Sequence, residues 1–318
     1  MIKRLRLIRA LLPILVFGFI GTSSSGQSLG FLDTTAQLFI GGASTYILPK
    51  DQLEVQFTNG LTSYWLAYNE FTQDNYSRIA NRRRTTFFQQ KLRAIYGFSA
   101  SQRWDLGVEA SYNHYRDDDD ARSSPLRVFS DGHPETGYSY RGLASLGFRF
   151  RATPVASLPE WTIQAGYSFP VGNLAPSVKR LLSSDLSTAD LLSTFFRKIG
   201  DGSYYFVQAQ GLYQYSTERV NYQGAGSFYL VQRLGGSWYL FPGLSYVWSN
   251  QSQKRGNYSN ISQIIFGGVG LQWQPRFAYS FSLVYLYPFR YDIGSPFVEV
   301  VPNSYASINL GVRALLNR

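Results

Sequence analysis

The stretch from Ser227 to Trp248, SFYLVQRLGGSWYLFPGLSYVW, alternates between two kinds of side chain. After its Gly-Gly turn, every even position from Trp238 to Trp248 is apolar, whereas the odd positions mix Tyr, Phe and Val with Gly and Ser. A period of two is typical of a β-strand, whose successive side chains point to opposite faces. Trp at both ends of the apolar row fits a strand that crosses a bilayer, because Trp favours the two headgroup layers.

The same alternation recurs along most of the chain. It is clear in seven further segments and noisier in three others. The clear segments are Phe87–Ser99, Arg103–Tyr115, Tyr138–Ala152, Glu160–Phe169, Tyr205–Tyr215, Phe277–Tyr287 and Tyr305–Ala314, and the noisier ones are Leu53–Tyr68, Ala225–Leu234 and Ile261–Gln274. The rows run to about ten residues, the length that a tilted strand needs to cross the hydrocarbon of a membrane.

A secreted soluble β-protein would also alternate. The strands of soluble sandwiches, however, are usually about five or six residues long and turn their polar face to water. Here the polar rows are rich in Gly, Ser and Gln, which suits a crowded or wet barrel interior, and large aromatic residues end several apolar rows. The pattern therefore favours an all-β fold, a transmembrane antiparallel up-and-down β-barrel, over the soluble alternative.

The connections predict hairpins, but they leave the strand number open. Short links alternate in part with long ones, such as Asn69–Arg83 and Asp117–Gly137, as in barrels with short turns at one end and long loops at the other. Eleven strands can be counted, and a single-chain bacterial barrel needs an even number. Adding Ala36–Ile47 gives twelve, which we expect, with ten and fourteen as alternatives.

The long link Val171–Gly202 differs from the others, because its apolar residues recur near helical spacing. We expect a short helical loop that packs on the barrel mouth. The alternatives are a helix folded into the interior as a constriction, and a strand that the pattern disguises.

The first residues have the composition of a secretory signal peptide. Four basic residues come before a short apolar run, Leu11–Ile20, and a small, polar stretch follows. The apolar run is too short for a transmembrane helix, which needs about 20 residues. The predicted organisation is a signal peptide at 1–27, an N-terminal segment at 28–50 that could hold a first strand, and a barrel at 51–318.

Composition narrows the function classes. The chain has no Cys, which excludes a disulfide framework, a lipid-anchored Cys and a thiolate metal site. Its net charge of +10 includes the basic residues of the signal, so the exported chain is only mildly basic. That excess is weaker than nucleic-acid binding requires, and we expect no nucleic-acid partner and no cofactor. Outer-membrane lipids and the barrel-assembly machinery are the expected partners.

Catalytic chemistry has little support in the sequence. The two His residues are His114, on the lipid-facing row of its strand, and His133, in a turn. Ser111 and Asn113 point to the face opposite His114, so they cannot form a catalytic pair with it. The run Asp117–Asp120 lacks the ordered spacing of a Ca²⁺ site and suits a solvated loop. We therefore expect no enzyme, with a barrel hydrolase as the least favoured alternative.

The candidate functional residues are those on the polar rows, which would line the interior. They are Lys91, Arg93, Arg103, Asp105, Glu109, Arg141, Arg149, Arg151, Gln208, Gln210, Arg233 and Arg313. An excess of basic groups inside a low-dielectric wall would favour anions. Alternatively, these charges pair across neighbouring strands and brace the wall. A separate basic run, Arg82–Arg84, lies where a long loop re-enters the barrel, and it would suit lipopolysaccharide phosphates or simply a solvated strand end.

Two pieces carry a family resemblance: GYSFPVGN at Gly166–Asn173 and the hairpin YLVQRLGGSWYLFPGLSYVW. On these the chain resembles outer-membrane β-barrels of the transporter type, those linked to aromatic-compound uptake and, more distantly, fatty-acid channels. The resemblance implies a passive channel for small solutes in the outer membrane. The alternative is a structural or adhesive surface barrel with a plugged interior. The chain ends in ALLNR, whereas many such barrels end in an aromatic residue.

Overall fold

The structure is a computed structural model that describes most of residues 47–317. Gaps fall at 73–74, 131–137, 173–174, 183–184, 201, 254–258, 277–278, 294–297 and 301–303. The predicted signal peptide, and the possible first strand at 36–47 except its last residue, lie outside the described residues.

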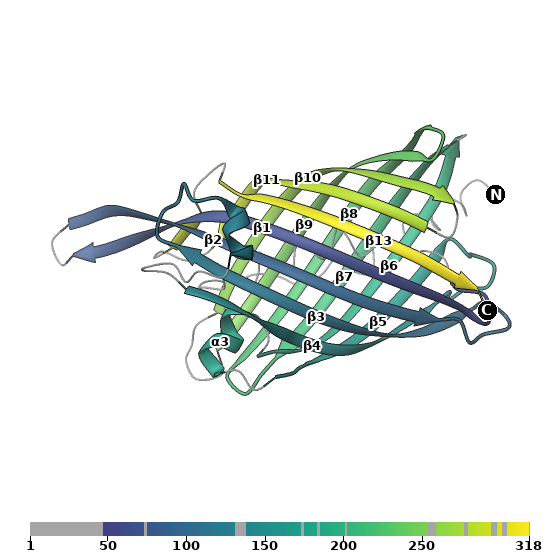
Figure 1. Cartoon of the computed structure of the whole chain (residues 1–318), viewed down its shortest axis with the longest axis horizontal. Coiled ribbons are helices and arrows are strands. Elements are labelled where there is room, and N and C mark those ends of the chain that lie inside the picture. Colours follow the sequence, from purple (N-terminus) through teal and green to yellow (C-terminus); the bar gives the residue numbers. More distant parts are fainter. Residues whose placement is uncertain are drawn as a thin grey trace, which may run out of the picture.

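Long antiparallel strands form nearly all of the described structure (Figure 1). They are β1 (Gln52–Thr72), β2 (Asn75–Tyr96), β3 (Trp104–Asp118), β4 (Tyr138–Ala152), β5 (Trp161–Pro170), β6 (Ser187–Gly200), β7 (Ser203–Tyr215), β8 (Arg219–Gly235), β9 (Trp238–Gln253), β10 (Ser259–Arg276), β11 (Tyr279–Ile293), β12 (Val298–Val300) and β13 (Ala306–Asn317). Two short helical pieces accompany them, the 3-10 turn η1 (Pro125–Phe129) and the helix α3 (Pro176–Leu181).

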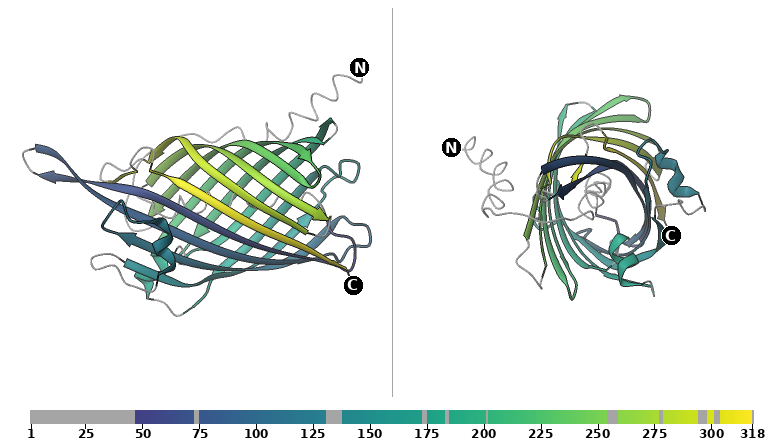
Figure 2. Two further views of the ribbon diagram at one scale, coloured as in Figure 1. Left: turned by 45° about the horizontal axis from the view of Figure 1, so that its top comes forward. Right: turned by 90° about the vertical axis from the view of Figure 1, so that its left-hand side faces the viewer.

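Twelve of these strands close a barrel, which confirms the predicted fold class and strand number. Each pairs with its neighbour in sequence, and β1 pairs with both β2 and β13, so the ring has no free edge. The three-residue strand β12 only extends the pairing of β1 beyond the barrel. Figure 2 shows the closed ring of strands when the barrel is viewed along its length. Closure lets the backbone N–H and C=O groups of each strand pair with neighbouring strands, as a lipid environment requires.

The alternation of the sequence becomes an inside and an outside of this wall. Leu92, Val108 and Phe148 are 50%, 54% and 61% exposed, whereas their neighbours Arg93 and Arg149 are 8% and 7% exposed. Exposed apolar side chains on every barrel strand form an outer band, and stacked aromatic pairs such as Trp238 and Trp273 lie near the short turns. In water this much exposed apolar surface would drive aggregation, so the band indicates contact with acyl chains.

The prediction of a helical loop at Val171–Gly202 was largely wrong. Only the six residues of α3 are helical, and Ser187–Gly200 forms the barrel strand β6. Its Leu and Phe residues face both sides of the wall, so their spacing imitated a helix: Leu191 is 44% exposed, and Phe196 stacks on the interior residue Phe206. This strand brings the count from eleven to twelve.

The predicted loop at Asn69–Arg83 is also largely strand. Strands β1 and β2 continue past the barrel with paired residues as far as Thr72 and Asn75. The result is a hairpin arm that projects from the long-loop end of the barrel (Figure 1).

A β-bulge in β4 divides the row that the sequence placed on one face. Ser111 pairs with Ser145, but Tyr112 pairs with Leu143, so Ala144 is an extra residue. Such an insertion reverses the inward and outward positions on either side of it. Above the bulge Tyr140 therefore packs with interior residues, and Arg141 belongs to the outward row.

A short segment before β1 closes against the short-turn end. Leu48 is fully buried beside Ile95 and Leu315, and its N–H donates to Asp105 Oδ2 at 3.1 Å. The backbone of this segment also passes directly over Gly97. A Cβ at that glycine would lie 2.0 Å from the Pro49 carbonyl oxygen, so only glycine permits the contact.

Replacing Gly97 with Ala should therefore lower stability by about 1–3 kcal/mol, because the new methyl must push backbone aside. The measurement is urea unfolding of the refolded barrel in lipid vesicles. Gly211→Ala is the matched control, since its Cβ would meet nothing within 4 Å. We expect no loss there, and equal loss in both variants would contradict the role of the segment.

Candidate functional site

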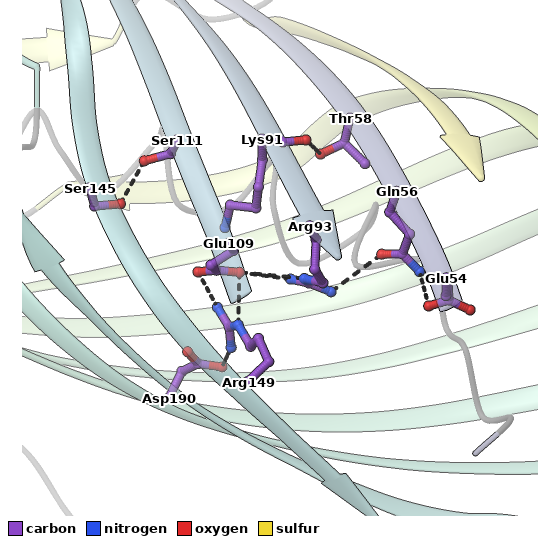
Figure 3. Close-up of polar contacts among 10 residues, drawn as sticks. All are labelled: Glu54, Gln56, Thr58, Lys91, Arg93, Glu109, Ser111, Ser145, Arg149 and Asp190. Carbon is purple, nitrogen blue, oxygen red and sulfur yellow. Dashed lines mark hydrogen bonds and ion pairs between the residues drawn. The ribbon is translucent and has the colours of Figure 1, made fainter. Parts of the chain in front are cut away.

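The inward-facing charged residues form one connected group, which we call the charged belt. It consists of Glu54, Lys91, Arg93, Asp105, Glu109, Arg149, Arg151, Asp190 and Arg313. They come from β1, β2, β3, β4, β6 and β13, and most lie in the half of the barrel that carries the short turns. Figure 3 shows part of this region, where Gln56 of β1 accepts from Arg93 at 3.4 Å and donates to Glu54 at 2.8 Å.

Arg151 joins three strands at the lower edge of the belt. Its Nε and Nη2 donate to both carboxylate oxygens of Asp105, at 2.9 and 2.8 Å, and its Nη1 donates to Glu54 at 3.2 Å. The second Glu54 oxygen accepts from Arg313 at 2.8 Å. Glu54 and Asp105 are 0% exposed, so these bonds replace the water that both carboxylates have lost.

Arg149 holds the centre of the belt. Its Nε and Nη2 each donate to Glu109 at 2.8 Å, and its Nη1 donates to Asp190. This second contact crosses over β5 at Gly166, where a Cβ would lie 2.1 Å from the arginine. Arg93 Nε and Nη2 donate to Glu109 Oε2, which also accepts from Arg149 Nε, at 3.4 and 3.3 Å. The Lys91 side chain points toward Glu109 (Figure 3).

The belt is close to electrically neutral. Its five basic residues face four acidic ones, and every ion pair that joins them is largely buried. Paired charges of both signs cancel most of the potential that an excess of arginines would create. The geometry therefore supports the bracing interpretation of these residues more than anion selectivity.

A small polar cavity lies against the belt, between β2 and β7. Its volume is about 70 Å³, enough for roughly two water molecules. The lining includes Lys91, Glu109, Arg149 and Asp190, with hydroxyl and amide groups around them such as Ser111, Gln210 and Gln214. Such a lining can hydrogen-bond a small polar solute without a strong preference for either sign of charge.

An apolar cluster packs closely in another part of the interior, among buried polar side chains such as Gln223, Ser245 and Asn309. We call this the apolar wall: Tyr64, Leu66, Tyr229, Val247, Ile264, Phe266, Val284, Leu286 and Tyr305, with Phe206 and Phe241 against it. Two rings lie flat on inward glycines of the next strand, since a Cβ on Gly243 would meet Tyr229 at 2.3 Å and one on Gly270 would meet Phe241 at 1.9 Å. The nine buried residues of this wall are at most 7% exposed, so they pack closely against one another.

Three of the predicted interior residues lie elsewhere. Arg103 is exposed in the turn before β3, and Arg233 is exposed at the β8–β9 turn, where it donates to the Gly236 carbonyl at 2.8 and 3.1 Å. Arg141 is exposed on the outward row above the bulge. Each arginine was assigned to the interior from the alternation of its segment alone. That rule fails beyond the end of a strand and on the far side of an inserted residue.

The two predicted glutamines lie on inward positions of β7. Gln208 is 5% exposed and donates to Thr194 Oγ1 at 3.3 Å, and Gln210 lines the cavity. Asp190 was missed, because its segment was interpreted as helical. The signal was present: Asp190 and Thr194 share a parity in β6 opposite to that of Leu191.

The structure gives His114 a serine partner other than Ser111, but this pair adds little support to the hydrolase alternative. His114 Nε2 lies 3.1 Å from Ser139 Oγ, a pair on adjacent strands that the sequence did not suggest. His114 is 5% exposed, and its strand partner Phe88 packs against Phe129 of the loop that follows β3. A catalytic nucleophile needs access to a reacting atom.

Comparison with known proteins gives a likeness of fold. No protein-family model matches the sequence, and no curated protein matches it. An outer-membrane channel from Pseudomonas putida F1 superposes with a TM-score of 0.59 at 12% identity, over 86% of this chain and 98% of that one. The TodX monoaromatic hydrocarbon channel has a lower TM-score of 0.38 at 8% identity, and the match covers 86% of this chain and 91% of that one. The KdgM porin has a TM-score of 0.36 at 8% identity, and the match covers 82% of this chain and 98% of that one.

Among the described residues, no helix is both long and apolar enough to span a bilayer. The closed ring of twelve antiparallel strands and the exposed apolar band show that the chain is a membrane-spanning β-barrel, a fold that it shares with the Pseudomonas putida channel.

Proposed function

We propose that this barrel is a passive, low-conductance channel for small polar solutes, with weak preference for the sign of their charge. The observation that carries the proposal is the polar cavity beside a nearly neutral charged belt. By the usual arrangement of such barrels, the short turns face the periplasm and the long loops face outward. The belt and the Leu48 segment then form a constriction near the periplasmic exit.

The apolar wall supports a narrow route rather than a wide pore. Its nine buried residues are at most 7% exposed, whereas the described cavity is lined mainly by polar groups, so we place the solute route along that cavity. A barrel of about twelve strands is only somewhat wider than one its side chains can fill. Solute must therefore pass close to Lys91, Glu109 and Arg149, whose alternating charges can exchange hydrogen bonds with it.

Purified protein in a planar bilayer should give steady, small conductance steps. In a salt gradient the reversal potential should stay near zero, because the charges of the belt cancel. The measurement is single-channel current with potassium chloride on both sides. A strong anion preference would contradict the assignment of the arginines as bracing groups, and complete silence would contradict the channel itself.

A plugged surface scaffold is the second candidate, and the projecting hairpin arm of β1 and β2 favours it. Silence in the bilayer would support this function, particularly if removal of the arm abolished binding of cells to a surface. Steady conductance that persists without the arm would support the channel.

A further inference from the structure

The loop after β3 does not extend away from the barrel. Residues Asp119–Ser130, which we call the outer clasp, fold back over the outward face of β2 and β3. Arg84 Nε donates to the Ala121 carbonyl at 2.9 Å, and Arg116 Nη1 donates to Ser130 Oγ at 3.0 Å. Figure 2 shows the clasp outside the ring of strands.

The turn η1 packs against the barrel through Val128 and exposes an apolar edge formed by Leu126 and Phe129. Ser124 Oγ accepts the Leu126 N–H at 3.2 Å, which caps the start of the turn, and Val128 is fully buried beneath it. Phe129 packs edge-on against Phe88 of the lipid-facing row, with ring centroids 4.7 Å apart. Leu126 and Phe129 nevertheless remain 62% and 51% exposed.

The clasp lies at the height of the outer membrane surface. Ten positions of β3 separate Trp104, near the short turns, from His114, which pairs with Phe88. At about 3.3 Å per residue and a tilt of about 40°, they span a height of about 25 Å, the height of the apolar band of such barrels. The apolar edge of η1 therefore continues the band at its outer boundary.

The clasp carries exposed charges of both signs. Asp119 pairs with Arg83 at 2.5 Å, and Asp120 accepts the Arg122 N–H at 2.8 Å, so both carboxylates are turned toward protein groups. Arg122 and Arg127 are exposed, beside the apolar edge. The run Arg82–Arg84 suited phosphates in the sequence, but Arg83 pairs with two carboxylates and Arg84 is held by the clasp and by Trp65.

We propose that the outer clasp is a docking site for a phosphorylated glycolipid of the outer leaflet. Leu126 and Phe129 contact its acyl chains, and Arg122 and Arg127 bind its phosphates. Guanidinium groups form paired hydrogen bonds with phosphate, and exposed arginines beside an apolar edge match a lipid that carries phosphates next to its acyl chains. The site is outside the barrel, so it does not depend on the channel function.

Native mass spectrometry of the detergent-purified barrel with bis-phosphorylated lipid A tests the proposal. We expect retention of the lipid to fall about tenfold in Arg122→Gln/Arg127→Gln, because two charged contacts are lost. Leu126→Ser/Phe129→Ser should also weaken it, and Arg197→Gln/Lys198→Gln, at the exposed opposite end of β6, should not. Wild-type protein should retain dephosphorylated lipid A about as poorly as the arginine variant retains the intact lipid.

Equal retention by wild type and the arginine variant would overturn the site, and so would equal retention of dephosphorylated lipid. Inorganic pyrophosphate serves as the free-phosphate probe. If it displaces the lipid completely at micromolar concentration, the site is one for soluble phosphates and the lipid assignment is wrong. Heat-modified mobility on gels should confirm that each variant is a folded barrel before it is scored.

Discussion

Replacing Arg151 with Met should lower the free energy of unfolding by about 3–5 kcal/mol, the largest single-residue effect expected in this barrel. The arginine is 2% exposed and its guanidinium serves two carboxylates that are 0% exposed. Glu54 keeps its bonds from Arg313 and Gln56, but Asp105 keeps only the Leu48 N–H among the contacts described here. A buried carboxylate with so few donors accounts for most of the loss.

Reversible urea unfolding in lipid vesicles measures the effect. Arg103→Met is the matched control, because Arg103 is exposed one residue before the same strand as Asp105, and its loss should change stability by less than about 0.5 kcal/mol. Arg151→Lys keeps the charge but not the two-pronged geometry, so it should fall between wild type and Arg151→Met.

A double variant separates a missing partner from lost packing. Arg151→Met leaves the Asp105 carboxylate without its main donor, and Asp105→Asn removes the negative charge of that group. The double variant should therefore lose less stability than the sum of the two single variants. Additive losses would show that Arg151 stabilises through the volume of its side chain. A large shift in reversal potential without a loss of stability would instead make Arg151 a selectivity residue.

Alternation in the sequence predicted the barrel, because each strand in a closed wall has one lipid face and one interior face. It failed where a local rule was broken. In β6 both faces carry Leu and Phe, so Asp190 was hidden in an apparent helix. In β4 a single extra residue, Ala144, moved Arg141 from the inside to the outside.

The charged belt could be predicted as a set of residues but not as a set of pairs. Lys91, Arg93, Glu109, Arg149 and Arg151 all follow from the parity of their strands. The contact of Arg151 with Glu54 joins residues 97 positions apart, on strands that are not neighbours. Which charges meet across the interior depends on the tilt and stagger of the whole barrel, and short-range alternation carries neither.

Truncating both partners of the ion pair that crosses β5, Arg149→Ala/Asp190→Ala, should raise conductance severalfold. The two side chains line the cavity and lie across Gly166, so their removal enlarges the narrow polar side of the interior. The double change removes one charge of each sign, and Glu109 retains Arg93 at 3.3 Å. The reversal potential should therefore stay close to that of the wild type.

The single variants should behave differently from the pair. Arg149→Ala leaves Glu109 and Asp190 undercompensated, which should shift the reversal potential toward cations, and Asp190→Ala should shift it toward anions. Arg219→Ala/Asp185→Ala removes an ion pair of the same types near the start of β8, whose residues do not line the cavity, and should leave conductance unchanged. Unchanged conductance in Arg149→Ala/Asp190→Ala would mean that solute does not pass the cavity. In that case the route would have to cross the apolar wall, and truncating Tyr229 and Phe241 together should then raise the current instead.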